Sequence, residues 1–184
     1  MSGHYKSISV VIPHWPKTPA HDAALKRCID SLDGVDEIIV EVNDGIGFAK
    51  ACNLGLAKTH GDYILVVNND TVVTKGNLQT LCVPNTIVVP RIATGQVDNM
   101  PRAFYCMPRT VYEKVGGYDE RFEGGYYEDD DLIRRWMEAG VPIIVKNIVE
   151  VNHIGGLTMQ EIDAQGYQIA NQKRYEEKWG KHVK

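Results

Sequence analysis

The most constraining feature of this sequence is a series of three short apolar runs separated by longer amphipathic segments. The runs are SISVVI at residues 7–12, EIIVEV at 37–42 and YILVV at 63–67. Near-continuous apolar strands of this kind are typical of parallel sheets that are covered by helices on both faces. We expect the first strand to end at Pro13, because proline cannot donate to a sheet ladder.

The segments between these runs have the spacing of helices. Leu25, Cys28, Ile29 and Leu32 fall at i, i+3, i+4 and i+7, which predicts an amphipathic helix over residues 20–32. A second helix is expected over the segment that precedes the third run, at residues 48–58. The resulting order, strand–helix–strand–helix–strand, predicts an α/β fold built on a parallel sheet.

The second half of the chain has shorter and less regular patterns. Short strands are expected at residues 86–89, 103–107, 143–145 and 148–151. Helices are expected at residues 109–115, 129–139 and 160–179. No linker divides the 184 residues, so we expect one domain over residues 1–184.

Composition excludes several classes of protein. The formal net charge is −4, from 20 Lys and Arg against 24 Asp and Glu, which argues against a protein that binds mainly through nucleic-acid phosphates. No run approaches the roughly 18 apolar residues of a membrane span, and the N-terminus lacks the apolar core of a secretory signal. The four cysteines form no CxxC pair, so we expect reduced, buried thiols in a cytoplasmic protein.

Polar residues follow two of the predicted strands at the point where each strand ends. Asn43 and Asp44 follow the second run, and Asn68, Asn69 and Asp70 follow the third. Ligands bind at this edge of open α/β sheets. Asn, Asp and Gly also form turns, which would explain one such cluster. Two clusters on successive strands favour a binding site.

Four consecutive carboxylates at residues 128–131 begin a predicted helix. Helix capping would explain one or two of them, because carboxylates favour the positive end of the helix dipole. A carboxylate held there stays ionised at neutral pH and can act as a general base. His153 follows a predicted strand and is either structural or a metal ligand. One His, one Asp and diphosphate oxygens would suit Mn²⁺ or Mg²⁺.

Together these segments resemble the family 2 glycosyltransferases of the GT-A fold, a group that includes rhamnosyltransferases. The similarity rests on five segments in the family's order: SVVIP at residues 9–13, GFAKACNLGL at 47–56, GDYILVVNNDTVV at 61–73, CMPRTVYEKVGGYDERF at 106–122 and YEDDDLIRR at 127–135. The ending NQKRYEEKWG at residues 171–180 is also similar. The resemblance covers nearly the whole chain.

The resemblance implies a Rossmann-like, mostly parallel central sheet with helices on both faces and a small antiparallel second sheet. It implies a nucleotide-sugar-binding half (residues 1–83), an acceptor and catalytic half (84–158) and a C-terminal helix (159–184). The expected activity is metal-dependent, inverting transfer of a hexose from a nucleotide-diphosphate sugar to an acceptor hydroxyl. The expected donor is a UDP-sugar or dTDP-sugar, and the expected ion is Mn²⁺ or Mg²⁺.

The resemblance also implies roles for individual residues. Asp70 and His153 would hold the metal, and Asp129 would be the catalytic base with Glu128 beside it. Asp131 and Tyr127 would lie on the acceptor side. The residues expected to bind the donor are Pro13, His14, Asn43, Asp44, Lys50, Asn53, Asn68 and Asn69.

The chain departs from the family pattern at two places, and these keep alternatives open. Asn68 replaces the first aspartate of the family's DxD motif, and few residues separate Asp44 from Phe48 where relatives have another helix and strand. One alternative is a GT-A domain that binds a nucleotide or sugar without turnover. Another is a transferase that acts on a modified nucleic-acid base. A nucleotidyltransferase is disfavoured, because HWPKTP after the first strand is not a Gly-rich basic loop.

Overall fold

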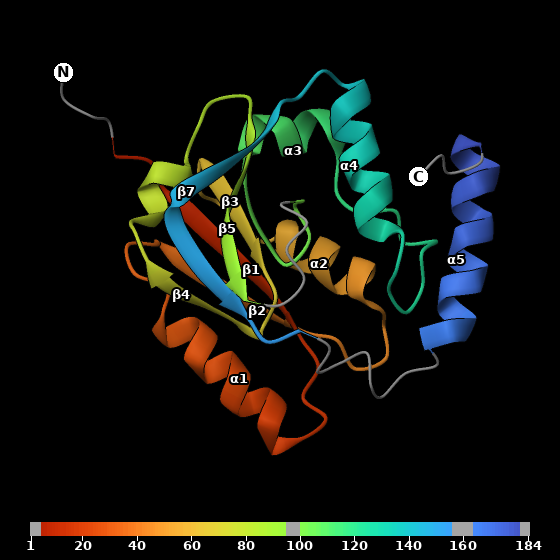
Figure 1. The fold of residues 1–184 in the computed structure, drawn as a ribbon, viewed down its shortest axis with the longest axis horizontal. Helices are drawn as coiled ribbons and strands as arrows, with labels where there is room; N and C mark the ends of the chain where they lie inside the picture. The colour runs from red at the N-terminus through yellow and green to blue at the C-terminus, as the bar shows by residue number, and fades with distance from the viewer. Residues whose placement is uncertain (1–4, 95–99, 156–163, 181–184) are drawn as a thin grey trace.

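A computed structural model describes residues 5–94, 100–155 and 164–180 of the chain (Figure 1). Its strands are β1 (Ile8–His14), β2 (Glu37–Val42), β3 (Tyr63–Val67), β4 (Thr71–Lys75), β5 (Ile87–Thr94), β6 (Phe104–Pro108) and β7 (Ile143–His153). Its helices are α1 (Pro19–Asp30), α2 (Phe48–Leu56), the 3₁₀ helix η1 (Leu78–Leu81), α3 (Arg109–Val115), α4 (Glu128–Glu138) and α5 (Ala164–Trp179). Of the predicted last helix, residues 160–163 lie outside the described residues.

The described strands form one sheet in the order β2-β1-β3-β6-β5-β7-β4. β1 pairs in parallel with β2 and β3, and β5 pairs in parallel with β7, whereas β6 and β4 are antiparallel to their neighbours. Five of the seven strands therefore run the same way, which confirms the mostly parallel sheet. The antiparallel pairs, expected in a small second sheet, belong to this same sheet: β6 lies between β3 and β5, and β4 pairs with β7 at the edge.

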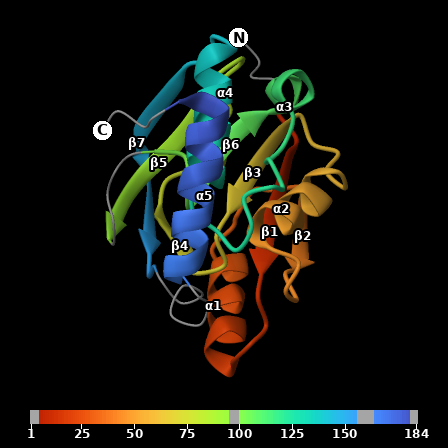
Figure 2. The same ribbon diagram turned by 90° about the vertical axis from the view of Figure 1, so that its right-hand side faces the viewer.

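Helices cover both faces of the sheet, because successive strand residues point to opposite sides. On β1, Val10 and Ile12 pack toward α1 and η1, whereas Val11 packs toward α2. The core on the α2 side also contains residues of α3 and α4, including the fully buried Trp136. Figures 1 and 2 show α1 on one side of the sheet and α2, α4 and α5 on the other, with α5 outermost.

β1 continues through Pro13 to His14, so the prediction that it ends at Pro13 is wrong. The backbone oxygen of Ser7 accepts from β3, and that of Ile8 accepts from the segment that leads into β2. Alternation along the strand therefore turns the backbone of odd-numbered residues toward β3. The β3 pairing has ended at Val11, so the missing N–H of Pro13 leaves no ladder bond unmade.

The sequence did not indicate β4, and the strands predicted at 143–145 and 148–151 are one strand, β7. The register between β5 and β7 shifts after Pro90, which carries β7 past the polar Lys146–Asn147 interruption in its sequence pattern. β4 lies against the second part of β7, with Thr71 opposite His153. This pairing decides the position of the residues on either side of it, Asp70 above all.

Among the described helices, none combines the length and the apolar character that a bilayer crossing requires. The four cysteines are all buried and none forms a disulfide, as expected.

The contact between α2 and β1 gives a stability prediction. A Cβ at Gly55 would lie 2.4 Å from Cγ1 of Val11, a fully buried and stiff side chain. We expect overpacking in Gly55→Ala to cost about 1–3 kcal/mol, which exceeds the gain of about 1 kcal/mol from replacing a helical glycine. Urea unfolding measures the difference.

Leu54→Ala, at a half-exposed position on the same helix, serves as the control and should change stability by less than Gly55→Ala. Adding Val11→Ala to Gly55→Ala removes the clashing methyl group, so the double variant should lose less than the sum of the single losses. A Gly55→Ala protein as stable as the parent would contradict the close packing.

Candidate functional site

Asp70 and His153, predicted as metal ligands, lie side by side at the carboxyl edge of the sheet. Asp70 Oδ1 is 3.2 Å from His153 Nε2, and Asp70 Oδ2 accepts from the backbone N–H of Gly155 at 3.0 Å. The backbone oxygen of Asp70 accepts from Ile154 N–H at 3.1 Å. The turn after β3 and the end of β7 are thus joined at three points, and Asp70 is only 6% exposed.

The donor atoms at this place fit a divalent ion that a substrate also binds. Carboxylate oxygens suit Mg²⁺ and Mn²⁺, and an imidazole beside them favours Mn²⁺ of the two. Asn68 Oδ1 is buried and has no hydrogen-bond partner among the described residues, so a further oxygen near Asp70 lacks a donor. No group of three or more His, Cys, Asp or Glu in the described part of the chain could hold a metal. Substrate oxygens would therefore have to complete the coordination.

His14 and Asn69 join the ends of β1 and β3. The Asn69 amide can only donate from Nδ2, so His14 Nδ1 accepts this bond, at 2.9 Å. The His14 ring therefore carries its proton on Nε2, which donates to Asp22 at 3.0 Å. Both ring nitrogens are used and His14 is 4% exposed, so it orients the turn of Asn69 and Asp70. Pro13, beside it, is also buried.

Two of the predicted donor-binding residues, Asn43 and Asn53, make hydrogen bonds to backbone groups of the protein. Asn43 Oδ1 accepts from Gly47 N–H at 2.8 Å and so closes the short connection between β2 and α2. Asn53 Nδ2 donates to the backbone oxygen of Tyr118 and to Glu120, both at 2.9 Å, and Asn53 Oδ1 accepts from Tyr118 N–H. The Asn53 amide is engaged within the protein on both sides.

Asp44 and Lys50 are the two exposed members of the predicted donor set. Lys50 lines a cavity of about 250 Å³ between the start of α2 and residues 120–123. Glu120 and Glu123 line the same cavity, so the cation and the helix N-terminus there face two carboxylates.

The four carboxylates that begin α4 have different environments. Asp131 is fully buried, and its carboxylate accepts hydrogen bonds from the side chains of Arg135 (2.9 Å), Lys178 (2.6 Å) and Trp179 (2.7 Å). Two of these donors belong to α5, so Asp131 joins α4 to α5. The expectation that Asp131 faces an acceptor finds no support in this geometry.

Glu128, Asp129 and Asp130 form the remainder of the group. Burial, followed by the charge of Asp129, raises the pKa of Glu128 well above its ordinary value. Asp130 accepts from Arg102 at 2.7 Å. Asp129, the predicted base, lies between Glu128 and Asp130 in the sequence, and its side chain is partly buried.

Arg102 pairs with Asp130 at the start of α4, and its neighbour Ala103 is hydrogen-bonded to the turn that carries Asp70. The sequence did not indicate Arg102 as a residue of the catalytic or metal site. It stands just before β6, whose Phe104 pairs with Val67 of β3. Next to it, the backbone oxygen of Ala103 accepts from Asn68 N–H at 2.8 Å. The start of α4 and the Asn68–Asn69–Asp70 turn therefore approach the same edge of the sheet.

Tyr127 ends a loop with an unusual backbone. Gly124, Gly125, Tyr126 and Tyr127 all have positive φ, at 71°, 113°, 70° and 69°. The left-handed conformation costs a non-glycine residue about 1–2 kcal/mol, so other contacts must hold the two tyrosines in it. The Tyr127 ring lies 5.5 Å from that of Tyr175 on α5, which orients it toward α5.

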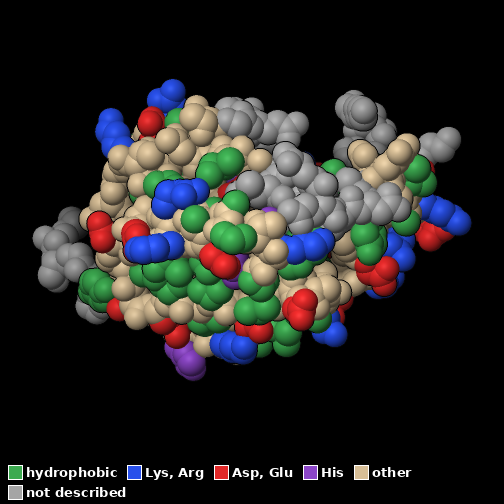
Figure 3. Space-filling model, turned by 90° about the horizontal axis from the view of Figure 1, so that it is seen from below, with side chains coloured by type: hydrophobic (Ala, Val, Ile, Leu, Met, Phe, Trp, Pro, Cys, Tyr) green, Lys and Arg blue, Asp and Glu red, His purple; other side chains and the backbone are tan. Residues whose placement is uncertain are grey.

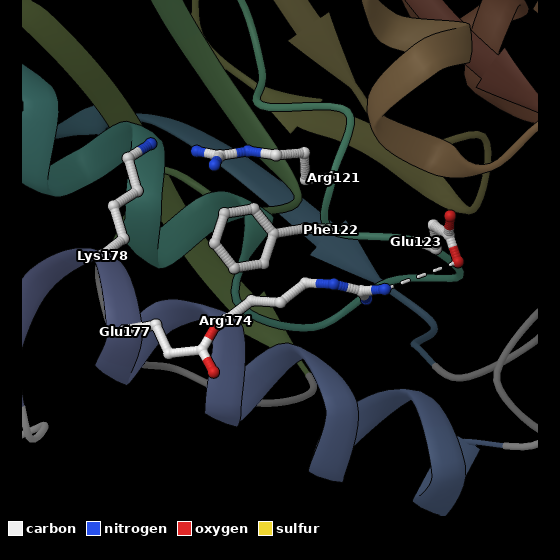
Figure 4. A pocket seen from close by; sticks show the side chains of 6 residues that line it. All are labelled: Arg121, Phe122, Glu123, Arg174, Glu177 and Lys178. Atoms are coloured by element: carbon white, nitrogen blue, oxygen red, sulfur yellow. Dashed lines mark ion pairs between the residues drawn. The ribbon is translucent and has the colours of Figure 1, made fainter.

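A larger cavity, of about 410 Å³, lies between the loop that precedes α4 and helix α5 (Figure 4). Its lining residues are Arg121, Phe122, Glu123, Arg174, Glu177 and Lys178. The basic groups are largely paired. Arg121, and then Lys178, hold the pKa of Asp119 well below its usual range, and Arg174 points toward Glu123 at 3.9 Å. This cavity therefore presents little uncompensated charge.

Where the structure describes the face toward which β1 and β7 run, no extended patch of one charge is present. Figure 3 shows this face, with acidic and basic side chains interspersed among apolar ones. A nucleic-acid surface would show clustered Lys and Arg.

Comparison with known families assigns part of the chain. A family model described as the N-terminal domain of galactosyltransferase matches residues 104–160. This stretch begins with β6 and includes all four carboxylates of α4 as well as His153. It does not support a family 2 assignment over the galactosyltransferase type. A search of curated proteins by sequence gives no match.

Solved structures share the fold. The catalytic domain of Drosophila β1,4-galactosyltransferase 7 in complex with xylobiose is 20% identical, with a TM-score of 0.62 over 86% of this chain and 75% of that one. GalNAc-T7 with UDP, GalNAc and Mn²⁺ is 14% identical, with a TM-score of 0.67 over 83% of this chain and 44% of that one. A mannosyltransferase from Pyrobaculum calidifontis in complex with GDP-Man and Mn²⁺ is 13% identical, with a TM-score of 0.60 over 84% and 59%. The chain has the GT-A fold.

The environments of the α4 carboxylates predict that neighbouring aspartates have unequal effects on stability. Asp131→Asn should cost about 3 kcal/mol, because it leaves Arg135 and Lys178 without their buried counter-charge. Asp130→Asn serves as the matched control. It removes one ion pair in which Arg102 is 37% exposed, so its cost should stay within about 1 kcal/mol. Urea unfolding measures the loss of stability in the two variants. Equal losses in the free energy of unfolding would refute the structural role of Asp131.

Proposed function

We propose that this protein is a metal-dependent glycosyltransferase that moves a sugar from a nucleotide-diphosphate donor to an acceptor hydroxyl with inversion. The observation that carries the proposal is the junction of Asp70 and His153, 3.2 Å apart at the carboxyl edge of a GT-A sheet, with the α4 carboxylates at the same edge. Neighbours in fold bind UDP with Mn²⁺, GDP-Man with Mn²⁺, or xylobiose. The family match over residues 104–160 favours a hexose donor.

Asp70 and His153 are the residues that would hold the ion, with a preference for Mn²⁺ over Mg²⁺ because one ligand is an imidazole. A divalent ion at this place supplies positive charge for the diphosphate that leaves with the nucleoside. The Gly155 N–H bond fixes Oδ2 of Asp70 and so leaves Oδ1 directed at His153. His14 and Asn69 hold the turn beneath, which keeps both ligands in place without a metal.

Asp129 is the residue we assign as general base. It stands in the first turn of α4, where the helix dipole stabilises its ionised form. Burial raises the pKa of Glu128 beside it, which disfavours a second negative charge at that point. Removal of the acceptor proton by Asp129, as the hydroxyl attacks the anomeric carbon from the face opposite the leaving group, gives inversion in one displacement.

The donor would lie along the edge formed by the ends of β1, β2 and β3. Lys50 and the N-terminus of α2 would meet a donor phosphate at the rim of the cavity of about 250 Å³, whose other charged lining residues are Glu120 and Glu123. Asp44 is exposed beside the same short connection and is our candidate for a contact to the nucleoside. We expect a UDP-sugar or a dTDP-sugar.

A GT-A domain that binds without turnover is the second candidate. It is favoured by Asn68 in place of an acidic ligand and by a protein ligand set of only two residues. A nucleic-acid acceptor has no comparable support, given the net charge of −4 and the mixed charges in Figure 3.

Calorimetric titration with UDP, dTDP, GDP and CMP, each with and without Mn²⁺, tests the metal and the donor together. We expect one of these nucleotides to bind, and Mn²⁺ to strengthen its binding. Asp70→Ala should weaken the Mn²⁺-dependent binding at least about tenfold, since loss of even an outer-shell partner typically has that effect. Asp33→Ala, at an exposed carboxylate before β2, is the control. Unchanged Mn²⁺ dependence in Asp70→Ala would place the metal elsewhere.

Asp129→Asn tests the base. We expect release of the nucleoside diphosphate from the sugar donor, with xylobiose as the probe acceptor, to slow about 10²–10⁴-fold, the usual contribution of a general base. Nucleotide binding should be unchanged, because Asp129 takes no part in it. Asp130→Asn keeps the same helix start and should retain most of the rate. A parallel loss of rate and nucleotide binding in Asp129→Asn would remove Asp129 from this role, whereas nucleotide binding by a parent without transfer would favour the binding domain.

A further inference from the structure

One side chain of α5 makes several hydrogen bonds to the loop that precedes α4. Asn171 of α5 is fully buried, and its Nδ2 donates to the backbone oxygens of Glu123 and Gly125 at 2.8 Å and of Tyr126 at 3.1 Å. Its Oδ1 accepts from Arg174 at 2.8 Å. The two N–H groups of this amide are thus shared among three backbone carbonyl oxygens of the loop.

This loop cannot rely on its own conformational preference. Four successive residues, 124–127, have positive φ, and two of them are tyrosines. Non-glycine residues persist in this region only when their surroundings impose it. The next residues along the chain are Glu128 and Asp129, so the path of this loop sets where α4 begins.

The remaining contacts of α5 lie on the same stripe of the helix. Tyr167, Asn171, Tyr175 and Lys178 are spaced at i, i+4, i+8 and i+11, which is one helix face. A Cβ at Gly124 would lie 2.4–2.6 Å from ring atoms of Tyr167, and Tyr175 lies against Tyr127. Lys178 reaches Asp131 inside α4. These α5 residues therefore contact both the loop and the first turn of α4, and fix the position of one relative to the other.

We propose that Asn171 is a positioning residue for the transfer reaction: it fixes the loop of residues 123–127 and through it directs Asp129 toward the acceptor. The proposal rests on the proposed function of Asp129. Asn171 touches neither substrate nor metal and acts by restraining the backbone from which the base projects. It also explains why a polar helix carries a fully buried asparagine.

Asn171→Asp is the first test. It keeps the shape of the side chain but turns a donor into an acceptor that faces three carbonyl oxygens. Amide hydrogen exchange at residues 123–129 should accelerate, and kcat should fall about a hundredfold, the loss that a misplacement of the order of 1 Å causes. The donor KM and the calorimetric affinity for the nucleotide should stay unchanged. Gln172→Glu, the same change at the next, exposed residue, is the control.

Gly124→Ala is the second test, and it leaves the buried amide intact. The new methyl group would strike the Tyr167 ring, so we expect the same pattern of faster exchange and lower kcat with unchanged nucleotide affinity. Gly140→Ala is its matched control, because Gly140 has the same φ of 71° and no atom within 4 Å of the added Cβ.

Two results would overturn the proposal. Unchanged exchange at residues 123–129 in Asn171→Asp would show that the amide does not hold the loop. A loosened loop with an unchanged kcat would show that the loop does not direct the base. Absence of transfer in the parent protein would instead contradict the proposed function, and the exchange measurement would still decide whether Asn171 restrains the loop.

Discussion

The pairing of β4 with β7 is the constraint on which the site depends. β4 is five residues long and follows directly on the Asn68–Asn69–Asp70 turn. Its antiparallel register with β7 sets Thr71 opposite His153 and so brings the Asp70 carboxylate to the imidazole. Without this pairing, the turn after β3 would be an ordinary polar turn, and His153 would lie on an unrelated loop.

A second constraint acts on the helix start that carries the proposed base. Four adjacent carboxylates repel one another, and the structure reduces this repulsion by separating their environments. Asp131 is buried against two cations and an indole, Asp130 pairs with Arg102, and burial raises the pKa of Glu128. The carboxylates of this one helix turn therefore differ in their partners and in their burial.

Local patterns in the sequence predicted the elements whose structure is decided locally. The bounds of β2, β3 and α3 coincide with the predicted residues, since each has its own apolar pattern and a clear stop signal. β4 was missed because TVVTK is only half apolar and becomes a strand through a partner that is remote in sequence. The end of β1 was misplaced because a proline is tolerated where the neighbouring strand has ended.

The candidate site divides in the same way. Residue types drew attention to Asp70, His153 and the α4 carboxylates, and the family resemblance suggested their roles; the structure brings them to one edge of the sheet. Residue types could not show that Asn53 is engaged by Tyr118 and Glu120, or that Asp131 is engaged by α5, because those partners lie far along the chain. Asn171 stands in a segment similar to the family's ending, but on a polar helix nothing in the sequence distinguishes a buried asparagine from its exposed neighbours.

The distance along the chain between the two halves of the site has a consequence for folding. The bond between Asp70 and Gly155 spans 85 residues, and β7 must be seated beside β5 before β4 has a surface on which to pair. Contacts of such long range form late, because the entropy of closing the intervening chain has to be overcome first. During synthesis, β1, β2 and β3 can assemble early, whereas the ligand pair can close only after the strand that carries His153 has left the ribosome.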